Sequence, residues 1–219
     1  MAARGAVAER SVERAIERRR AAYEEEVGRL VDASFALIRR EGHLEPKVGE
    51  IVAAAGLSNQ AFYKHFRSKD ELLLAVLDEG FRRLGEYLER RMQKARTPER
   101  RIRQWINGVL EQALDAESAR ASRPFALSRG RLAELFPDEV RTAEQRLVDP
   151  LRESIEEAVR AGELAAADPE RDAALIYGLA MGWVERQLMR SEPPSRRDAE
   201  HLLEFAMRGL RRLTTDPRR

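Results

Sequence analysis

The chain has 219 residues, of which 40 are Lys or Arg and 38 are Asp or Glu, so its formal net charge at pH 7 is only +2. This balance gives no electrostatic argument for nucleic-acid binding, while the length allows a hydrophobic core in one or two domains. The absence of cysteine excludes disulfides, thiolate catalysis and zinc–cysteine sites. Because the sequence contains neither a run of 18 apolar residues nor a signal-peptide core, we expect a cytoplasmic protein without a membrane partner.

Residues 1–26 are rich in Arg, Glu and Ala and are expected to form a charged N-terminal extension. Val12 and Ile16 are its clear apolar pair at helical spacing, which predicts a solvated helix. The alternative is a basic arm, in which Arg14 and the arginines at 18–20 contact the DNA backbone or minor groove.

Three helices are expected next in the chain. The first covers 27–42, where apolar residues share one face and a glycine ends the helix. Pro46 precedes a short helix over 47–56, and Ser58 is a suitable N-cap for another over 59–66. Two short helices joined by a tight turn that contains glycine are typical of a helix-turn-helix, whose second helix enters the DNA major groove. The sequence therefore predicts a three-helix DNA-binding unit.

The early residues of the second helix of this motif would lie at the base edges. Asn59 and Gln60 occupy these positions, and both side-chain types can pair bidentately with adenine. Lys64 is placed beside the groove, and Lys69 is at a helix N-terminus, where free N–H groups favour a phosphate. Residues 27–80 hold seven basic and eight acidic side chains, so this interpretation depends on the motif and not on net charge.

The segment 55–79, AGLSNQAFYKHFRSKDELLLAVLDE, resembles the DNA-binding signature of the TetR family of bacterial transcriptional regulators. The turn, the aromatic pair and the following helix cap fall at the family's spacing. These positions are Ala55, Gly56, Leu57, Ser58, Phe62, Tyr63, His65, Phe66, Ser68, Lys69, Glu71 and Leu72. The resemblance covers 27–79, and the rest agrees in length and helical character. It implies that Tyr63 and His65 contact phosphates.

The motif and the resemblance together give one set of expected DNA-contacting residues. They are Lys47, Ser58, Asn59, Gln60, Ala61, Tyr63, Lys64, His65 and Lys69. Three of them depart from the family pattern, since Lys47 stands where a threonine often caps the helix, and Gln60 and Ala61 stand where a glycine and a threonine are common. The departures concern base preference and one phosphate contact and leave the fold unchanged.

The remaining chain predicts helices only. Ser68 and Glu71 form a capping box at the start of a long helix, and Thr97 and Pro98 begin the next one. The segment 115–124 is a polar gap, and short helical pieces around a loop are expected after it.

Residues 138–161 predict a helix that Pro150 kinks or breaks. Asp168 and Pro169 begin another helix, which covers 173–189, and Ser195 begins the last one, which ends near Leu213. The sequence shows no repeat and no strand-like alternation, so we expect an all-α protein. Its predicted parts are the extension over 1–26, a helix-turn-helix DNA-binding domain over 27–72, and a regulatory domain for ligand binding and dimerisation over 73–219.

Large side chains in the regulatory domain are the candidates for the apolar pocket of a small effector. They are Trp105, Val109, Phe125, Phe136, Tyr177 and Met181. The alternative is that each belongs to the hydrophobic core. We place the pocket between the long helix from Ser68, the Trp105 helix and the Pro150 helix, and Arg129 or Arg131 could meet an acidic group of the ligand.

Small residues in the last two helices predict the dimer interface, because small side chains allow another helix to approach closely. The interface candidates are Ala174, Gly178, Gly182, Trp183, Leu202, Ala206 and Gly209. Two such helices from each chain would form a four-helix bundle, which is how the resembled family dimerises. The alternative is that the small residues pack only against the protein's own core.

The three histidines are scattered, and the sequence has no HExxH motif, no Gly-rich phosphate loop and no GxSxG elbow. We therefore expect no catalysis, no metal and no cofactor. The sequence predicts a homodimeric, sequence-specific transcriptional regulator, a repressor that a small, largely apolar ligand releases from a palindromic double-stranded operator. Two alternatives stay open: a helical interaction or scaffold protein that binds no DNA, and a TetR-like regulator that activates or lacks a ligand.

Overall fold

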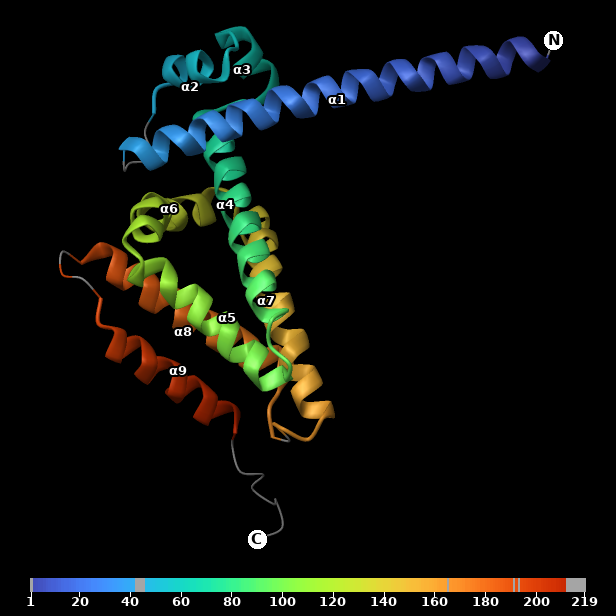
Figure 1. Cartoon of the computed structure of the whole chain (residues 1–219). Helices are drawn as coiled ribbons and strands as arrows, with labels where there is room; N and C mark the ends of the chain where they lie inside the picture. Colours follow the sequence, from blue (N-terminus) through green and yellow to red (C-terminus); the bar gives the residue numbers. More distant parts are fainter. Residues whose placement is uncertain (1, 42–45, 165, 191, 193, 212–219) are drawn as a thin grey trace. The chain divides into compact units, whose positions relative to one another are not determined.

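The computed structural model describes residues 2–41, 46–164, 166–190, 192 and 194–211. Over these ranges the chain forms nine helices and no strand, which confirms the all-α prediction (Figure 1). The helices are α1 (Ala2–Glu41), α2 (Val48–Ala55), α3 (Asn59–His65), α4 (Lys69–Met92), α5 (Pro98–Leu114), α6 (Ala116–Leu135), α7 (Pro137–Arg160), α8 (Pro169–Met189) and α9 (Arg196–Leu210). None of the helices in the described ranges combines the length and apolar character of a membrane span.

The chain divides into two compact units, residues 1–76 and 77–219. In the first unit, α1 packs against α2 and α3, and α2 packs against α3. Each helix contributes fully buried apolar side chains to a small core, as does the first part of α4: Leu30, Ile38, Ile51, Phe62 and Leu72. This core fixes the positions of the two short helices of the motif.

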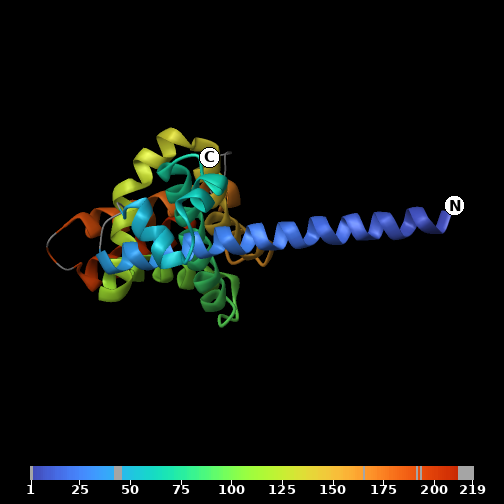
Figure 2. The ribbon, with the colours of Figure 1, turned by 90° about the horizontal axis from the view of Figure 1, so that it is seen from above.

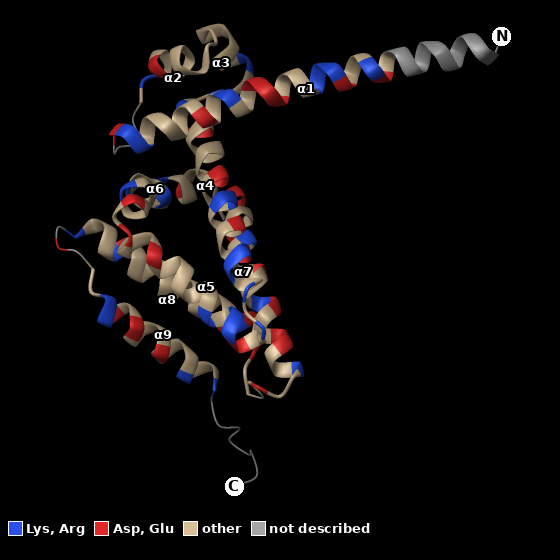
Figure 3. Cartoon of the chain, viewed as in Figure 1, with Lys and Arg blue, Asp and Glu red and all other residues tan. Residues whose placement is uncertain are grey.

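Helix α1 is one unbroken helix of 40 residues. The expected boundary near residue 26 is therefore not a break in the helix, and the N-terminal part of α1 extends past α2 and α3 (Figures 1 and 2). Val12 and Ile16 are exposed, as expected for a solvated helix. Charges of both signs alternate along the described side chains of α1 (Figure 3), so this helix does not present one continuous basic face.

In the second unit, α5 is the central helix and packs against α6, α7, α8 and α9. It begins as predicted, because the Thr97 hydroxyl accepts a hydrogen bond from the Arg100 amide at 3.3 Å and Pro98 is its first residue. Trp105 is completely buried, and its indole Nε1 donates to the Leu147 carbonyl at 2.9 Å. Its polar atom thus has a partner inside the core.

The polar gap predicted over 115–124 and the broken segment after it are wrong. Asp115 is instead the N-cap of α6, since its Oδ1 accepts from the Ser118 amide at 2.8 Å. The helix then continues through Pro124 and Gly130 to its end at Leu135. Because α6 packs against α5, α7 and α8, tertiary contacts outweigh the local cost of proline and glycine.

Helix α7 is likewise not broken at Pro150. Leu147 and Leu151, on either side of the proline, are both completely buried, so the apolar face continues across it and holds the helix together. At the other end of the chain, α8 starts at Pro169 with Asp168 as its N-cap, as predicted. The predicted end of the last helix near Leu213 lies outside the described residues.

Candidate functional site

The turn between α2 and α3 is built from local backbone signals. Gly56 has φ of 63°, in the left-handed region that favours glycine. Its amide donates to the Ala53 carbonyl at 3.2 Å, and the Leu57 amide donates to the Val52 carbonyl at 2.8 Å, which closes the end of α2. The Ser58 hydroxyl then accepts from the Ala61 amide at 3.1 Å and caps α3.

Arg29 of α1 completes this turn, a role that no local pattern in the sequence indicates. Its guanidinium donates to the Ala55 carbonyl from Nε at 3.0 Å and from Nη2 at 2.5 Å, and to the Gly56 carbonyl at 3.0 Å. These carbonyls lie at the C-terminal end of α2, where a positive charge is favourable. Arg29 therefore fixes α2 and the turn to α1.

Helix α3 separates an inward face from an outward face. Phe62 and Phe66 are buried, with ring centroids 5.8 Å apart. Asn59 and Gln60 are exposed, and the Tyr63 side chain is 64% exposed. The residues predicted to read bases, and the tyrosine predicted to contact a phosphate, thus share the solvent side of α3.

The other predicted contacts are placed less uniformly. Lys47 is exposed, and its amide donates to the Glu50 carboxylate at 2.9 Å at the start of α2. Ala61 and Lys69 are half-buried. The hydroxyl of Ser68 accepts from the Glu71 amide at 3.1 Å and caps α4 as predicted, while the Glu71 carboxylate accepts from the Arg67 amide at 2.6 Å and not from the Ser68 amide of a full capping box.

Lys64 and His65 are both held by Glu26 of α1. Lys64 Nζ lies 2.9 Å, and His65 Nε2 lies 2.5 Å, from Oε2 of this one carboxylate. The His65 side chain is 0% exposed, its ring stacks edge-on against Tyr23 with centroids 4.2 Å apart, and its Nδ1 has no hydrogen-bond partner among the described residues. The basic end of α3 therefore has an acidic neighbour that lies 38 residues earlier in the chain.

This arrangement changes what Lys64 and His65 offer to DNA. Hydrogen bonds from Lys64, and after it from His65, lower the pKa of the Glu26 carboxyl below its ordinary value, so the carboxylate is ionised at neutral pH. The predicted phosphate contacts require Lys64 to leave Glu26 and the His65 ring to leave its buried place. They remain predictions, because a DNA phosphate would have to compete with the Glu26 carboxylate for Lys64.

The residues proposed for the effector pocket do not share one environment. Trp105 and Val109 are completely buried, and Tyr177 is buried. Phe125, Phe136 and Met181 are half-buried. Trp105 and Val109, on α5, therefore belong to the hydrophobic core of the second unit. The candidates with accessible surface are Phe125 on α6, Phe136 between α6 and α7, and Met181 on α8.

Arg129 occupies a position that the sequence did not reveal. The expectation was that it could meet an acidic group of a ligand, but it meets two carboxylates of the protein itself. Its Nε lies 2.8 Å from Glu144 Oε1, and its Nη1 donates to Glu185. Tyr177 of α8 interacts with this ion-pair cluster. Burial raises the pKa of its hydroxyl most, and the charge of Glu144 raises it further.

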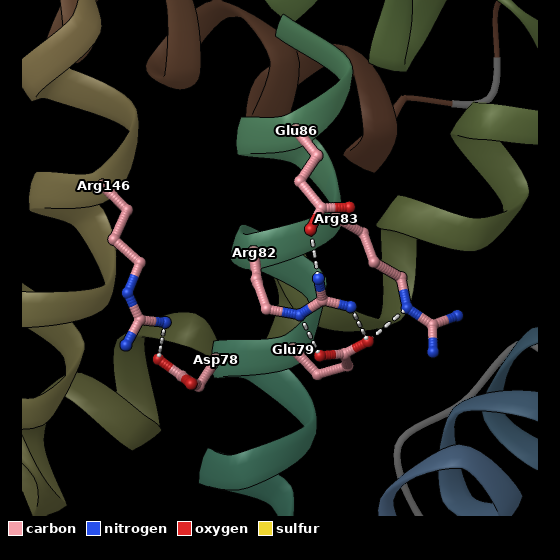
Figure 4. A network of polar contacts seen from close by, with 6 residues as sticks. All are labelled: Asp78, Glu79, Arg82, Arg83, Glu86 and Arg146. Carbon is pink, nitrogen blue, oxygen red and sulfur yellow. Dashed lines mark hydrogen bonds and ion pairs between the residues drawn. The ribbon is translucent and has the colours of Figure 1, made fainter. Parts of the chain in front are cut away.

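The part of α4 in the second unit is joined to its neighbours by ion pairs (Figure 4). Asp78 accepts from Arg146 of α7 at 2.6 Å. Within α4, Glu79 accepts from Arg82 at 2.6 and 2.7 Å and from Arg83 at 2.6 Å, and Arg82 also donates to Glu86. These contacts stabilise the helix and hold it to α7.

Further along α4, the contacts are with α5. The Tyr87 hydroxyl donates to Glu111 Oε2 at 2.5 Å and accepts from Arg91 at 2.7 Å. A Cβ added at Gly108 of α5 would lie 2.6 Å from a methyl group of Leu88, so the glycine permits the close approach of the two helices. The region proposed for the pocket is therefore tightly packed at this point.

The predicted dimer residues lie on two sides of α8 and α9. Ala174, Gly178 and Gly209 are exposed and Gly182 is half-buried, and Cβ atoms added at the three glycines would meet nothing within 4 Å. Trp183, Leu202 and Ala206 are buried inside the unit. Two large apolar side chains, Leu175 and Phe205, are exposed beside the small residues, at 69% and 58%. The glycines therefore do not serve the chain's own core.

Comparison with known proteins places similarity first in the helix-turn-helix. Residues 30–76 match the family model described as bacterial regulatory proteins, tetR family. The HTH-type transcriptional regulator BetI of Brucella canis is 36% identical over 73 residues, which are 33% of this chain and 37% of BetI. The chain thus matches little more than a third of the length of these BetI relatives.

A second group of similarities extends over more of the chain. The HTH-type transcriptional regulator CymR of Pseudomonas putida is 27% identical over 171 residues, 75% of this chain and 80% of CymR. The crystal structure of RolR in complex with resorcinol has the same fold, with a TM-score of 0.66 at 15% identity over 86% of this chain and 89% of RolR. The helix-turn-helix of this chain is thus similar to that of the TetR family of bacterial transcriptional regulators, and its similarity to one such regulator continues into the second unit.

Proposed function

We propose that this protein is a sequence-specific DNA-binding repressor that acts as a homodimer and leaves its operator when a small, largely apolar ligand binds the second unit. Each protomer would insert α3 into the major groove. A two-fold dimer on a palindromic operator needs its two recognition helices about 34–36 Å apart, which is one turn of the duplex.

The observation that carries this proposal is the division of α3 into two faces. Phe62 and Phe66 anchor the helix to the core of the first unit, while Asn59, Gln60 and Tyr63 face solvent. A helix held by its apolar face, with amide side chains at the start of its outer face, has the form required to read base edges. Exposed phosphate-binding groups at its flanks would fix the register.

Regulation by a ligand requires two states of the protein with different affinity for DNA. Helix α4 (Lys69–Met92) belongs to both units, since the division falls after Val76, so a shift of its second half would move its first half as well. RolR, which shares the fold, was crystallised with resorcinol, and this supports a small ligand for the present chain.

Dimerisation through α8 and α9 is part of the same proposal. Gly178, Gly182 and Gly209 open onto space in the single chain, and the apolar side chains of Leu175 and Phe205 flank them in solvent. Large exposed apolar side chains beside small residues suit a surface that another helix covers. A second copy of the chain would supply the helices that cover it.

The proposal is tested by a gel shift with DNA from the region upstream of the protein's own gene. The expected result is a retarded complex that survives excess random duplex and weakens as salt rises, because phosphate contacts release counterions. Binding that random duplex removes completely would contradict sequence-specific recognition. The absence of a complex with any duplex would favour the alternative of a helical interaction protein.

A further inference from the structure

We propose that Arg129, Glu144, Glu185 and Tyr177 form the polar end of the effector site, and that the effector presents a neutral hydroxyl group, phenolic or alcoholic, to them. This inference rests on the proposed function, because it assumes that the second unit binds a regulatory ligand. It goes further in naming the site and the chemical class of the ligand.

The four residues come from three helices that pack against one another. Arg129 is on α6, Glu144 on α7, and Tyr177 and Glu185 on α8. The Arg129 guanidinium lies 2.6 Å from Glu144 Oε1 through Nη2 and also donates to Glu185. The three charged side chains are between 21% and 28% exposed, so the cluster is mostly shielded but still reached by solvent.

Tyr177 supplies the observation that points to a ligand. The residue is only 8% exposed, and its buried hydroxyl has no partner within hydrogen-bond distance among the described residues, although the Glu144 carboxylate is close to it. Buried polar atoms in folded proteins nearly always have a partner, and leaving one without a partner is unfavourable. Burial raises the pKa of this hydroxyl, so it stays protonated at neutral pH and can both donate and accept a hydrogen bond.

The charge of the cluster selects the ligand class. One guanidinium and two carboxylates give a formal charge of −1, and Arg129 already contacts both Glu144 and Glu185. A carboxylate on the ligand would approach two like charges and find the cation occupied. The acidic ligand group considered from the sequence is therefore disfavoured at Arg129.

A neutral hydroxyl group meets both requirements of the site. Its oxygen can accept from the Tyr177 hydroxyl, and its proton can be donated to a free lone pair of Glu144 or Glu185. Removing a neutral hydroxyl from water costs less than removing a charge. Met181, one helical turn after Tyr177 and half-buried, offers an apolar surface for the rest of the ligand.

The test measures ligand binding to the full chain without DNA, by isothermal titration. The probes share a ring and differ in one group: resorcinol is a neutral diol, benzoate is an anion and toluene has no polar group. We expect resorcinol to bind at least tenfold more tightly than either of the other two. Equal or tighter binding of benzoate, or no binding of resorcinol at millimolar concentration, would overturn the proposal.

Two variants separate a ligand contact from a structural role. Tyr177→Phe should keep the fold and its melting temperature and lose at least tenfold in resorcinol affinity. Glu144→Gln should weaken resorcinol and strengthen benzoate, because it removes one like charge. Tyr87→Phe is the matched control, since the Tyr87 hydroxyl already bonds to Glu111, and it should leave resorcinol affinity unchanged.

Unchanged resorcinol affinity in Tyr177→Phe would show that this hydroxyl is not part of the site and would overturn the inference. DNA binding of the same proteins is measured separately. If the wild type binds resorcinol but no DNA, the proposed function fails while the site stands. If it binds operator DNA but prefers benzoate, the ligand class fails while the function stands.

Discussion

The carboxylate of Glu26 lies 2.5 Å from Nε2 of His65 and joins α1 to the end of the recognition helix α3. The same oxygen accepts from Lys64 at 2.9 Å. In the free protein, two side chains that the family resemblance assigns to phosphates thus both contact one carboxylate of the same chain. If Lys64 binds a phosphate as predicted, DNA must displace Glu26 from it, and this competition would set part of the affinity.

Glu26→Gln should strengthen binding to operator and to random DNA by about 3- to 10-fold, because phosphates would no longer compete with a carboxylate for Lys64. The orientation of α3 should persist, since Phe62 remains fully buried. Fluorescence anisotropy with both DNAs measures the change. Glu24→Gln is the control, because Glu24 is on the same helix but pairs with Arg20. Weaker binding of Glu26→Gln would mean that Glu26 serves mainly to orient α3.

Arg29→Ala should destabilise the first unit by about 1–2 kcal/mol, because it removes the donors from the carbonyls at the end of α2. A loss of this size corresponds to roughly 2–8 °C in melting temperature for a chain of this length. Thermal unfolding followed by circular dichroism measures it, with the exposed Arg18→Ala as the control. A melting temperature equal to the control would show that water replaces the guanidinium without cost.

The two kinds of side chain on α3 should respond differently to truncation. Lys64→Ala should weaken binding to all sequences about equally and lower the salt slope by about 1. Gln60→Ala should cost about 1–3 kcal/mol on the preferred site and relax preference at that position. Gln145→Ala, at an exposed position of α7, is the control. If Gln60→Ala weakened random and operator DNA equally, base readout would not belong to Gln60.

The helix-turn-helix could be predicted from the sequence because its signals are local. Gly56 and Ser58 specify a left-handed residue and a helix cap within a few positions, and both are found as expected. Arg29 and Glu26 act across 26 to 39 residues, a separation at which no spacing rule applies. Counting charges along α3 therefore missed the carboxylate that neutralises its basic end.

In the second unit, the difference between local signals and contacts from distant helices explains why some predictions from the sequence were wrong. The segment 115–136 carries Pro124 and Gly130, which are local signals for interruption, yet α6 is continuous because three other helices pack on it. Arg129 looked free in the sequence because Glu144 and Glu185 come from two other helices. Local propensity predicts where helices start more reliably than it predicts what their side chains contact.

The ion pairs of α4 predict a pH-dependent stability. A hydrogen bond from Arg82, with a further one from Arg83, lowers the pKa of Glu79 from 4.5 to about 2. A carboxyl group with a depressed pKa in the folded state stabilises that state above its unfolded pKa, and the contribution is lost as pH falls from 4.5 towards 2. Because both arginines are partly exposed, we expect about 1 kcal/mol at pH 7.

Glu79→Gln should therefore unfold at a lower urea concentration than wild type at pH 7, and the difference should shrink steadily below pH 4.5. Glu86→Gln serves as the control, since Glu86 is 49% exposed and contacts only the edge of the same network. A difference between Glu79→Gln and wild type that stayed constant from pH 7 to pH 2.5 would exclude the carboxylate charge as its cause.

The last prediction concerns the dimer. Gly178 lies on the exposed side of α8, and a Cβ built there meets nothing within 4 Å in the single chain. Gly178→Leu should therefore fold normally, because the larger side chain enters solvent and not the protein's core. In a dimer formed through α8 and α9 the same side chain would clash with the partner, since the small residues are what allow close approach.

We expect Gly178→Leu to sediment as a monomer in analytical ultracentrifugation, with an unchanged circular dichroism spectrum. It should also lose operator binding, because a single helix-turn-helix contacts only one half-site. Gly130→Leu is the matched control: it also places a leucine at an exposed helical glycine with nothing within 4 Å, but on α6, outside the proposed interface. It should remain dimeric and bind the operator. A folded, dimeric Gly178→Leu protein would move the two-fold axis away from α8.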